Sequence, residues 1–120
     1  MNPPKEDSQS ILPSMIGQGV TIVDWDLVYE VVAGNILMLR EVLACNTLAT
    51  DEVFAVMISP SDYVPVSGVN QPYVQVIVNL VTLTSYILQL ATAVPSGFKV
   101  WVYGSVDDLN YHISGVPVQR

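Results

Sequence analysis

Charged side chains are scarce in this sequence, and basic ones are the scarcest. Only 12% of the 120 residues are charged, about half the fraction of roughly 25% that is usual in soluble domains. Four Lys and Arg residues stand against eleven Asp and Glu residues, which gives a formal net charge of -7 at pH 7. Such a chain repels phosphate backbones and anionic lipid headgroups. The composition therefore argues against a nucleic acid partner.

Cysteine and histidine are almost absent as well. The single cysteine, Cys45, excludes an intramolecular disulfide, so a disulfide-stapled secreted scaffold is not expected. The single histidine, His112, restricts catalytic sites: no serine lies in a nucleophile-elbow pattern, and no thiolate or imidazole cluster suits zinc. We therefore expect a protein that is not an enzyme and holds no cofactor. A calcium site built from Asp24, Asp26 and the Asp107-Asp108 pair is the alternative to simple surface acids.

No signal peptide or membrane span is expected. The first ten residues contain no apolar segment of the kind that a signal peptide needs. Val74–Val94 is free of charge over 21 residues, which is long enough for a membrane helix. However, Val74, Val76, Val78 and Leu80 recur with the period of two that is typical of strands. This stretch therefore predicts strands and no membrane contact.

Branched side chains dominate the rest of the composition. Val occurs 21 times, and Val, Ile and Thr together fill 35 positions, which favours strands because branched side chains suit a pleated sheet. Between residues 23 and 33 apolar residues alternate with polar ones, and Gly34-Asn35 is typical of a two-residue hairpin turn. Ile36–Cys45 is then predicted as the returning strand. A helix is the alternative there, because the segment is rich in good helix formers.

The hairpin predicted for residues 23–45 has one apolar face and one mixed face. Its register sets Val31 against Met38 and Leu27 against Val42, so the apolar face is continuous. The other face mixes acids with aliphatic residues and is a poor surface for water. We therefore expect it to contact another subunit. Its aliphatic members are Val28, Val32, Leu37, Leu39 and Leu43.

Further strands and one long loop are expected in the second half. Val53–Ser59 is predicted to be a strand buried on both sides, and Val94-Pro95-Ser96-Gly97 is typical of a hairpin loop. Residues 59–72 contain three prolines and one glycine, which predict a long ordered loop that carries function or contacts. The other predicted strands are Tyr73–Val81, Ser85–Thr92, Phe98–Ser105 and Leu109–Ile113.

Together these segments predict one all-β domain. We expect an antiparallel β-sandwich or jelly roll of about seven strands over residues 19–120. An extended N-terminal arm is expected over residues 1–18, because the segment has four Pro and Gly residues and no sustained period. The arm also contains apolar side chains, which predict that it docks on a neighbouring subunit.

The shortage of charge predicts that the chain is a subunit of a homo-oligomer. A folded monomer of this length exposes roughly 6,400 Å². Its 15 charged side chains then leave apolar patches that are large enough to mark interfaces. The predicted subunit interface consists of residues from the arm, the mixed hairpin face and the long loop. They are Ile11, Leu12, Val28, Val32, Leu37, Leu39, Leu43, Tyr63 and Val64.

The short acidic chain, its arm and the closing segment Ala93-Val94-Pro95-Ser96-Gly97-Phe98-Lys99-Val100-Trp101-Val102-Tyr103-Gly104-Ser105 resemble small β-rich virion proteins of tailed bacteriophages. The resemblance is to capsid decoration or cement proteins in particular. It implies a jelly-roll or sandwich subunit, often trimeric, that has no catalytic residues and stabilises the shell. Its implied partner is the major capsid protein or another virion protein, and its implied location is the virion, assembled in the host cytoplasm.

A carbohydrate- or receptor-binding module, for instance at a phage tail, is the alternative. Six Tyr and two Trp residues are available for a sugar-stacking platform, with Trp101 as the residue to test. Against this, Trp25 and Tyr29 alternate with acids, as core residues do. In the cement interpretation, acids at the rim of the interface set the orientation of the subunit. These acids are Asp62, Asp107 and Asp108.

Overall fold

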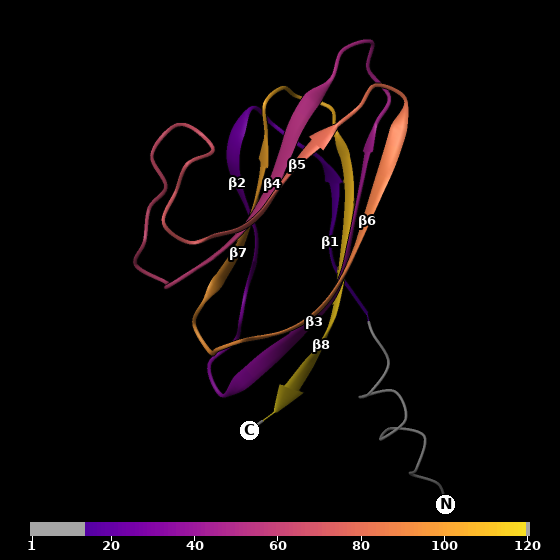
Figure 1. The fold of residues 1–120 in the computed structure, drawn as a ribbon. Helices are drawn as coiled ribbons and strands as arrows, with labels where there is room; N and C mark the ends of the chain where they lie inside the picture. The colour runs from indigo at the N-terminus through magenta and orange to yellow at the C-terminus, as the bar shows by residue number, and fades with distance from the viewer. Residues whose placement is uncertain (1–13, 120) are drawn as a thin grey trace, which may run out of the picture.

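The computed structural model describes residues 14–119, which form eight β-strands and no helix. Two antiparallel sheets of four strands each face one another (Figure 1). Sheet A has the order β1-β8-β3-β6, and sheet B has the order β2-β7-β4-β5. The strands are β1 (Ser14–Val20), β2 (Asp24–Glu30), β3 (Asn35–Asn46), β4 (Glu52–Ser59), β5 (Val74–Leu80), β6 (Thr84–Val94), β7 (Lys99–Gly104) and β8 (Asn110–Gln119).

The two sheets share one apolar core. Leu37 and Ile113 of sheet A pack with Phe54 and Val102 of sheet B, and all four side chains are buried. The prediction that Val53–Ser59 is a strand with both faces buried is confirmed, since β4 is buried from Phe54 onward. The described residues contain no helix that is long and apolar enough to cross a membrane. The uncharged stretch from residue 74 to 94 instead forms β5 and β6.

Short turns carry the chain from one sheet to the other. Only β4 and β5 are consecutive strands that pair within one sheet. The turn at Gly34 connects β2 of sheet B to β3 of sheet A, and the turn at Pro95–Gly97 connects β6 of sheet A to β7 of sheet B. The prediction of a hairpin at each of these two turns is therefore wrong. Both chain reversals are present, with positive φ at Gly34 and Gly97, but a turn sequence does not decide which sheet the next strand joins.

Bulges explain why the faces of the predicted hairpin were misassigned. The register of β3 shifts between Leu39 and Glu41 in its pairing with both neighbours. Leu37 and Leu39 before the shift and Val42 after it are therefore all buried in the core. A similar shift interrupts β2. Because side chains alternate with a period of two, an alternation followed through a bulge assigns the residues beyond it to the wrong face.

The N-terminal boundary also differs from the prediction. The predicted arm includes residues 14–18, but these residues belong to β1. β1 pairs with β8 at the edge of sheet A. The sheets therefore begin by Ser14 instead of residue 19, and they contain eight strands instead of seven. The sequence does not predict this strand, because Gly17 and Gly19 have low strand propensity. A Cβ on Gly17 would lie 2.0 Å from Cγ1 of Val28, so the close approach of β2 excludes a larger residue there.

Candidate interaction surfaces

The 60–73 loop packs on the outer face of sheet B. The indole Nε1 of Trp25 donates a hydrogen bond of 2.7 Å to the carbonyl oxygen of Gly68. The carboxylate of Asp24 accepts hydrogen bonds from the Ser67 hydroxyl (2.6 Å) and from the Gly68 amide (3.1 Å). Both anchors belong to β2, so this edge strand positions the tip of the loop. The loop is ordered by these bonds, as the sequence predicts.

Gln71 is the internal support of the 60–73 loop, and its side chain is buried. Its Oε1 accepts hydrogen bonds from the Tyr63 hydroxyl (2.6 Å) and from the Val66 amide (3.2 Å). Its Nε2 donates to the carbonyl oxygens of Val66 (3.1 Å) and Gly68 (2.9 Å). One side chain thus satisfies backbone groups that water would otherwise have to reach.

Replacing Gln71 with alanine is expected to loosen the loop. The change leaves the part-buried Tyr63 hydroxyl and the amide and carbonyl groups of Val66 without this partner, at a cost of about 2 kcal/mol. Amide exchange at Val66 should accelerate by more than about tenfold, measured by hydrogen–deuterium exchange. Gln75→Ala is the matched control, because the Gln75 side chain is exposed and donates only to the carbonyl of Tyr73. Equal exchange in the two variants would show that Gln71 does not hold the loop.

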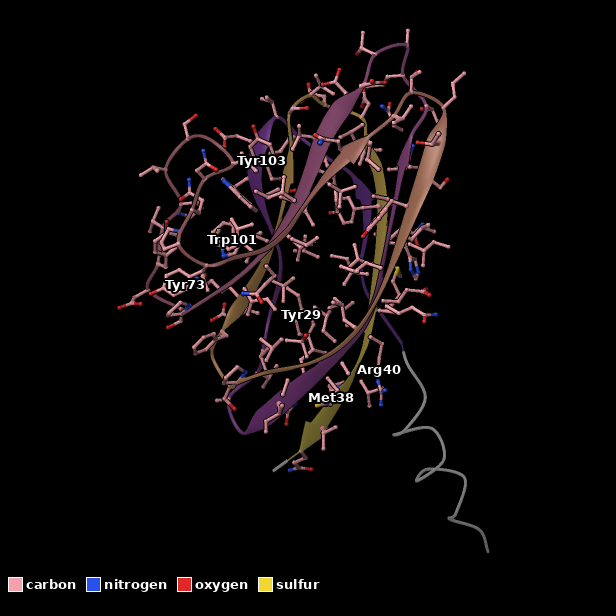
Figure 2. All side chains as sticks on the ribbon, in the orientation of Figure 1. Tyr29, Met38, Arg40, Tyr73, Trp101 and Tyr103 are labelled. Atoms are coloured by element: carbon pink, nitrogen blue, oxygen red, sulfur yellow. The ribbon has the colours of Figure 1, made fainter. Side chains whose placement is uncertain are left out.

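Aromatic rings gather on the same side of the molecule as this loop. Figure 2 shows Trp101, Tyr103 and Tyr73 together there. The rings of Trp25 and Tyr103 lie 5.2 Å apart, between centroids. The indole of Trp101 donates a hydrogen bond of 2.9 Å to the Ser59 hydroxyl. Both tryptophan N–H groups are therefore used inside the chain, where they anchor the loop and the end of β4.

The tyrosines of the loop pack on each other. The rings of Tyr63 and Tyr73 make an edge-to-face contact, with 5.0 Å between their centroids. Tyr111, in β8, is buried in the core, and burial, helped by the carboxylate of Asp26, raises the pKa of its phenol. The aromatic side chains thus support the fold on both sides of sheet B.

Carboxylates accept local hydrogen bonds at the ends of the strands. Asp107 accepts the amide of Val23 at 2.7 Å. The hydroxyls of Thr50 and Ser105 donate to Glu52 and lower the pKa of its carboxyl group. Within residues 14–119, no three or more His, Cys, Asp or Glu side chains gather in a way that could hold a metal ion. The structure therefore adds no support for calcium binding.

The outer face of sheet A is almost free of charge. In the register of the sheet, the only ionised residues of the described strands on this face are Arg40 and Glu41 of β3. Figure 2 shows Arg40 on the side away from the 60–73 loop. Met15, Val20 and Val118 are exposed on the half of the face that β1 and β8 form. We call this half the β1/β8 face; neither of its strands contains Asp, Glu, Lys or Arg.

A hollow of about 300 Å³ lies on the β1/β8 face and extends onto β3. Val20, Leu43, Cys45 and His112 contribute to its lining. The Sγ atom of Cys45 lies 3.0 Å from the hydroxyl oxygen of Ser85, and this hydroxyl is the hydrogen-bond partner that the structure gives the thiol. The hollow is uncharged, and it is open and large enough to receive an apolar side chain of a partner.

A second opening lies where the edges of the two sheets meet. A cleft of about 210 Å³ between the sheets is lined by residues of β3, β4, β5 and β6. Leu39, Val56 and Leu88 give it apolar walls, and Gln75 and Thr92 are its polar members. The cleft lies beside β5 and β6, the last strands of sheets B and A.

The nine predicted interface residues do not form one surface. Leu37 and Leu39 are buried in the core of the chain itself, so their assignment to a subunit interface is wrong. Val28 is half-buried and packs against the same core. Leu43 lies on the outer face of sheet A, where it lines the hollow. The others are Val32, exposed in the turn after β2, Tyr63 and the exposed Val64 in the loop, and Ile11 and Leu12, which lie outside the described residues.

Several exposed apolar residues do not belong to the predicted interface. Met15, Val20, Ile87 and Val118 all point outward from sheet A and are exposed. Their common signal is an apolar residue in a strand without charges. That signal is ambiguous in the sequence, because a strand buried on both sides has the same composition.

Comparison with known proteins adds no relative. No family model, no curated protein and no solved structure matches this chain. Its function therefore has to be argued from its own surfaces.

Proposed function

We propose that this chain is a non-enzymatic structural subunit of a virion, of the capsid decoration or cement type. The observation that carries the proposal is the β1/β8 face, where Val20 lines an uncharged hollow at one end and Met15 and Val118 are exposed further along the strands. Apolar surface without charges is characteristic of the core of a protein interface. In this role the face binds the major capsid protein or another virion protein.

The distribution of charge supports a fixed orientation on the shell. Most ionised residues of the described chain belong to sheet B or to the connections at the ends of the strands. In the proposed orientation the outer face of sheet A, which is almost free of charge, meets the shell, and the acidic side faces water and keeps the decorated particle soluble. The residues concerned are Asp24, Asp26, Glu30, Asp51, Glu52, Asp62, Lys99, Asp107 and Asp108.

The strand order supports a jelly roll as the finer description of the fold. Eight strands in two sheets of four, with a chain that alternates between the sheets, are the features of that fold. Jelly rolls are frequent in viral capsids and in lectins. Since one fold serves many functions, this agreement adds to the proposal without carrying it.

Binding to the shell follows from burial of apolar surface. Each 100 Å² of apolar surface removed from water contributes about 2.5 kcal/mol before the costs of association. A patch of ordinary interface size therefore suffices to hold one subunit. Many subunits that bridge neighbouring capsid proteins then resist expansion or rupture of the shell together.

A co-sedimentation experiment tests the proposal. Capsids of the virus that carries the gene, prepared without this protein, are mixed with the purified chain and separated on a sucrose gradient. Val20→Lys should weaken binding by at least about tenfold, because it places a charge in the lining of the uncharged hollow. Leu27→Lys on sheet B is the matched control, since Leu27 is 42% exposed and Val20 is 46% exposed.

Two results would reject the shell-binding role. One is a wild-type chain that stays at the top of the gradient at all concentrations. The other is equal binding by the Val20→Lys and Leu27→Lys variants, which would show that the β1/β8 face is not the contact.

The carbohydrate- or receptor-binding alternative is favoured by one observation, the aromatic rings that gather beside the 60–73 loop. It predicts a signal on a glycan array that disappears in the Trp101→Ala variant. The decoration proposal predicts no glycan signal for the wild-type chain. The internal hydrogen bonds of both indoles leave their N–H groups unavailable to a sugar, which is why the decoration role is preferred.

A further inference from the structure

Two free strand edges lie next to each other on one side of the molecule. β5 is the last strand of sheet B and β6 is the last strand of sheet A. A short turn connects them, at the top of the molecule in Figure 1. Along each outer edge, backbone N–H and C=O groups point away from the sheet, where no described strand pairs with them. Such groups form a template for another extended strand.

The β5/β6 side lacks two features that normally protect an edge, charged side chains and proline. β2, at the opposite edge of sheet B, carries three carboxylates in seven residues, Asp24, Asp26 and Glu30. β5 and β6 carry no charge and no proline. Their pairing with β4 and β3 is regular over Val76–Leu80 and Thr84–Gln89, and the register shifts only beyond these stretches, next to Gln75 in β5 and after Gln89 in β6.

Exposed apolar side chains gather along the same stretch. Five large hydrophobic residues between positions 77 and 87 are 36% to 77% exposed. Val81 and Leu83 belong to the turn at the end of the two strands, where the carboxylate of Asp51 accepts the amide of Thr82 at 2.9 Å. The edge is thus unpaired and uncharged, and apolar side chains flank it: Ile87 points outward from sheet A, and Ile77 points outward from sheet B. The five residues are Ile77, Val81, Leu83, Tyr86 and Ile87.

We propose that a second copy of this chain occupies this edge, with β6 pairing antiparallel to β6 of the other copy across a two-fold axis near Ile87. Such an axis, perpendicular to sheet A, sets Ile87 opposite its own equivalent and Ser85 opposite Gln89. These residues all point outward from sheet A, so paired residues lie on one face, as a continuous sheet requires. The two four-stranded sheets A become one sheet of eight strands.

The same axis brings the remaining features of this side into the contact. It sets the β5 edges of the two copies beside each other and covers the mouth of the cleft between the sheets. The cleft walls, including Val76, Leu88 and Leu90, then lose contact with water. One symmetric arrangement therefore accounts for the free edges, the exposed Ile87 and the opening.

A second copy fits this edge better than a charged peptide does. The edge offers no charge to attract one, whereas its pattern is complementary to itself under a two-fold rotation. Pairing along about 25 Å of strand, over a depth of about 20 Å for two sheets with side chains, covers roughly 500 Å² of each copy. The total of about 1,000 Å² is at the lower limit for specific interfaces. We therefore expect a dimer with a dissociation constant in the micromolar range.

This pairing uses a surface other than the β1/β8 face, so it goes beyond the proposed function and does not depend on it. Dimers of decoration subunits would bridge neighbouring binding sites on a shell. The resemblance to cement proteins instead implies trimers, so the mass in solution separates the two arrangements.

Sedimentation equilibrium of the full chain, from about 1 to 100 µM, tests the edge pairing. The wild-type chain should show a monomer–dimer equilibrium. Ile87→Lys should raise the dissociation constant at least about tenfold, because it places two positive charges opposite each other on the axis. Val20→Lys is the matched control, an exposed branched residue on the opposite edge of the same sheet, and it should dimerise like the wild type.

Hydrogen exchange supplies a readout that needs no variant. Between Thr84 and Gln89, the backbone amides that point away from β3 should exchange several-fold more slowly at 100 µM than at about 1 µM. The amides of β1 should not change. A monomer at 100 µM, a trimer, or an Ile87→Lys variant that dimerises normally would overturn the inference. The capsid experiment keeps the two proposals apart, since Ile87→Lys should still bind capsids and Val20→Lys should still dimerise.

Discussion

Replacing Leu37 with alanine is expected to lower the free energy of unfolding by about 3 kcal/mol and the melting temperature by roughly 10 °C. Leu37 is 0% exposed and belongs to the shared core of the two sheets. The truncation removes apolar contacts and leaves a cavity that close-packed neighbours fill only in part. Urea unfolding followed by tryptophan fluorescence measures the change, at about 0.5 µM so that dimers do not contribute.

Leu43→Ala is the control for this measurement. Leu43 comes from the same strand, but it lies half-buried on the outer face of sheet A. Its truncation should cost about 1 kcal/mol or less, because little buried area is lost. If Leu37 belonged to a subunit interface, the order would be reversed: Leu37→Ala would leave the unfolding of the monomer unchanged and would weaken association. That outcome would contradict the bulge in β3.

Gly104→Ala is the second change with a large expected effect, about 2 to 3 kcal/mol of lost stability. An added Cβ would lie 2.5 Å from Oγ1 of Thr21 and 2.8 Å from the backbone oxygen of Val106. The strand cannot shift to make room, because Gly104 pairs with β2 on one side and with β4 on the other. The Thr21 hydroxyl in turn donates to Val106 and accepts the amide of Leu109.

Gly97→Ala separates this steric effect from backbone strain. Gly97 has a φ of 81° and open space around the position of a Cβ, so alanine there should cost only about 1 kcal/mol. Urea midpoints of the two variants should therefore differ clearly, with Gly104→Ala the less stable. A Gly104→Ala variant as stable as Gly97→Ala would show that the contact between the Thr21 segment and β7 is loose.

Local patterns in the sequence identify the strands and turns of this protein, because strands depend on branched side chains and turns on glycine and proline. The long loop and the doubly buried β4 follow from composition in the same way. Sheet membership does not follow from local patterns. The turns at Gly34 and Gly97 reverse the chain in either case, and only packing over the whole chain decides that each strand crosses to the opposite sheet.

The same limit applies to the candidate interfaces. In the sequence, Leu37 and Leu39 alternate onto the face opposite Val42. The extra residue Arg40 shifts the alternation, and all three side chains are therefore buried in the core. The uncharged stretch from residue 74 to 94 is evident in the sequence, but its meaning depends on strand order. In the middle of a sheet it would be ordinary core. At the two adjacent edges it becomes the surface to which a second copy is proposed to bind.

The pairing of the first strand with the last also has a consequence for biosynthesis. Ser14 lies opposite Gly115, and β8 lies between β1 and β3 in sheet A. β1 therefore has no neighbour in its sheet until β8 has left the ribosome. The apolar strands made earlier stay incompletely covered until then, so native folding waits for β8, and long-range contacts set a slow rate.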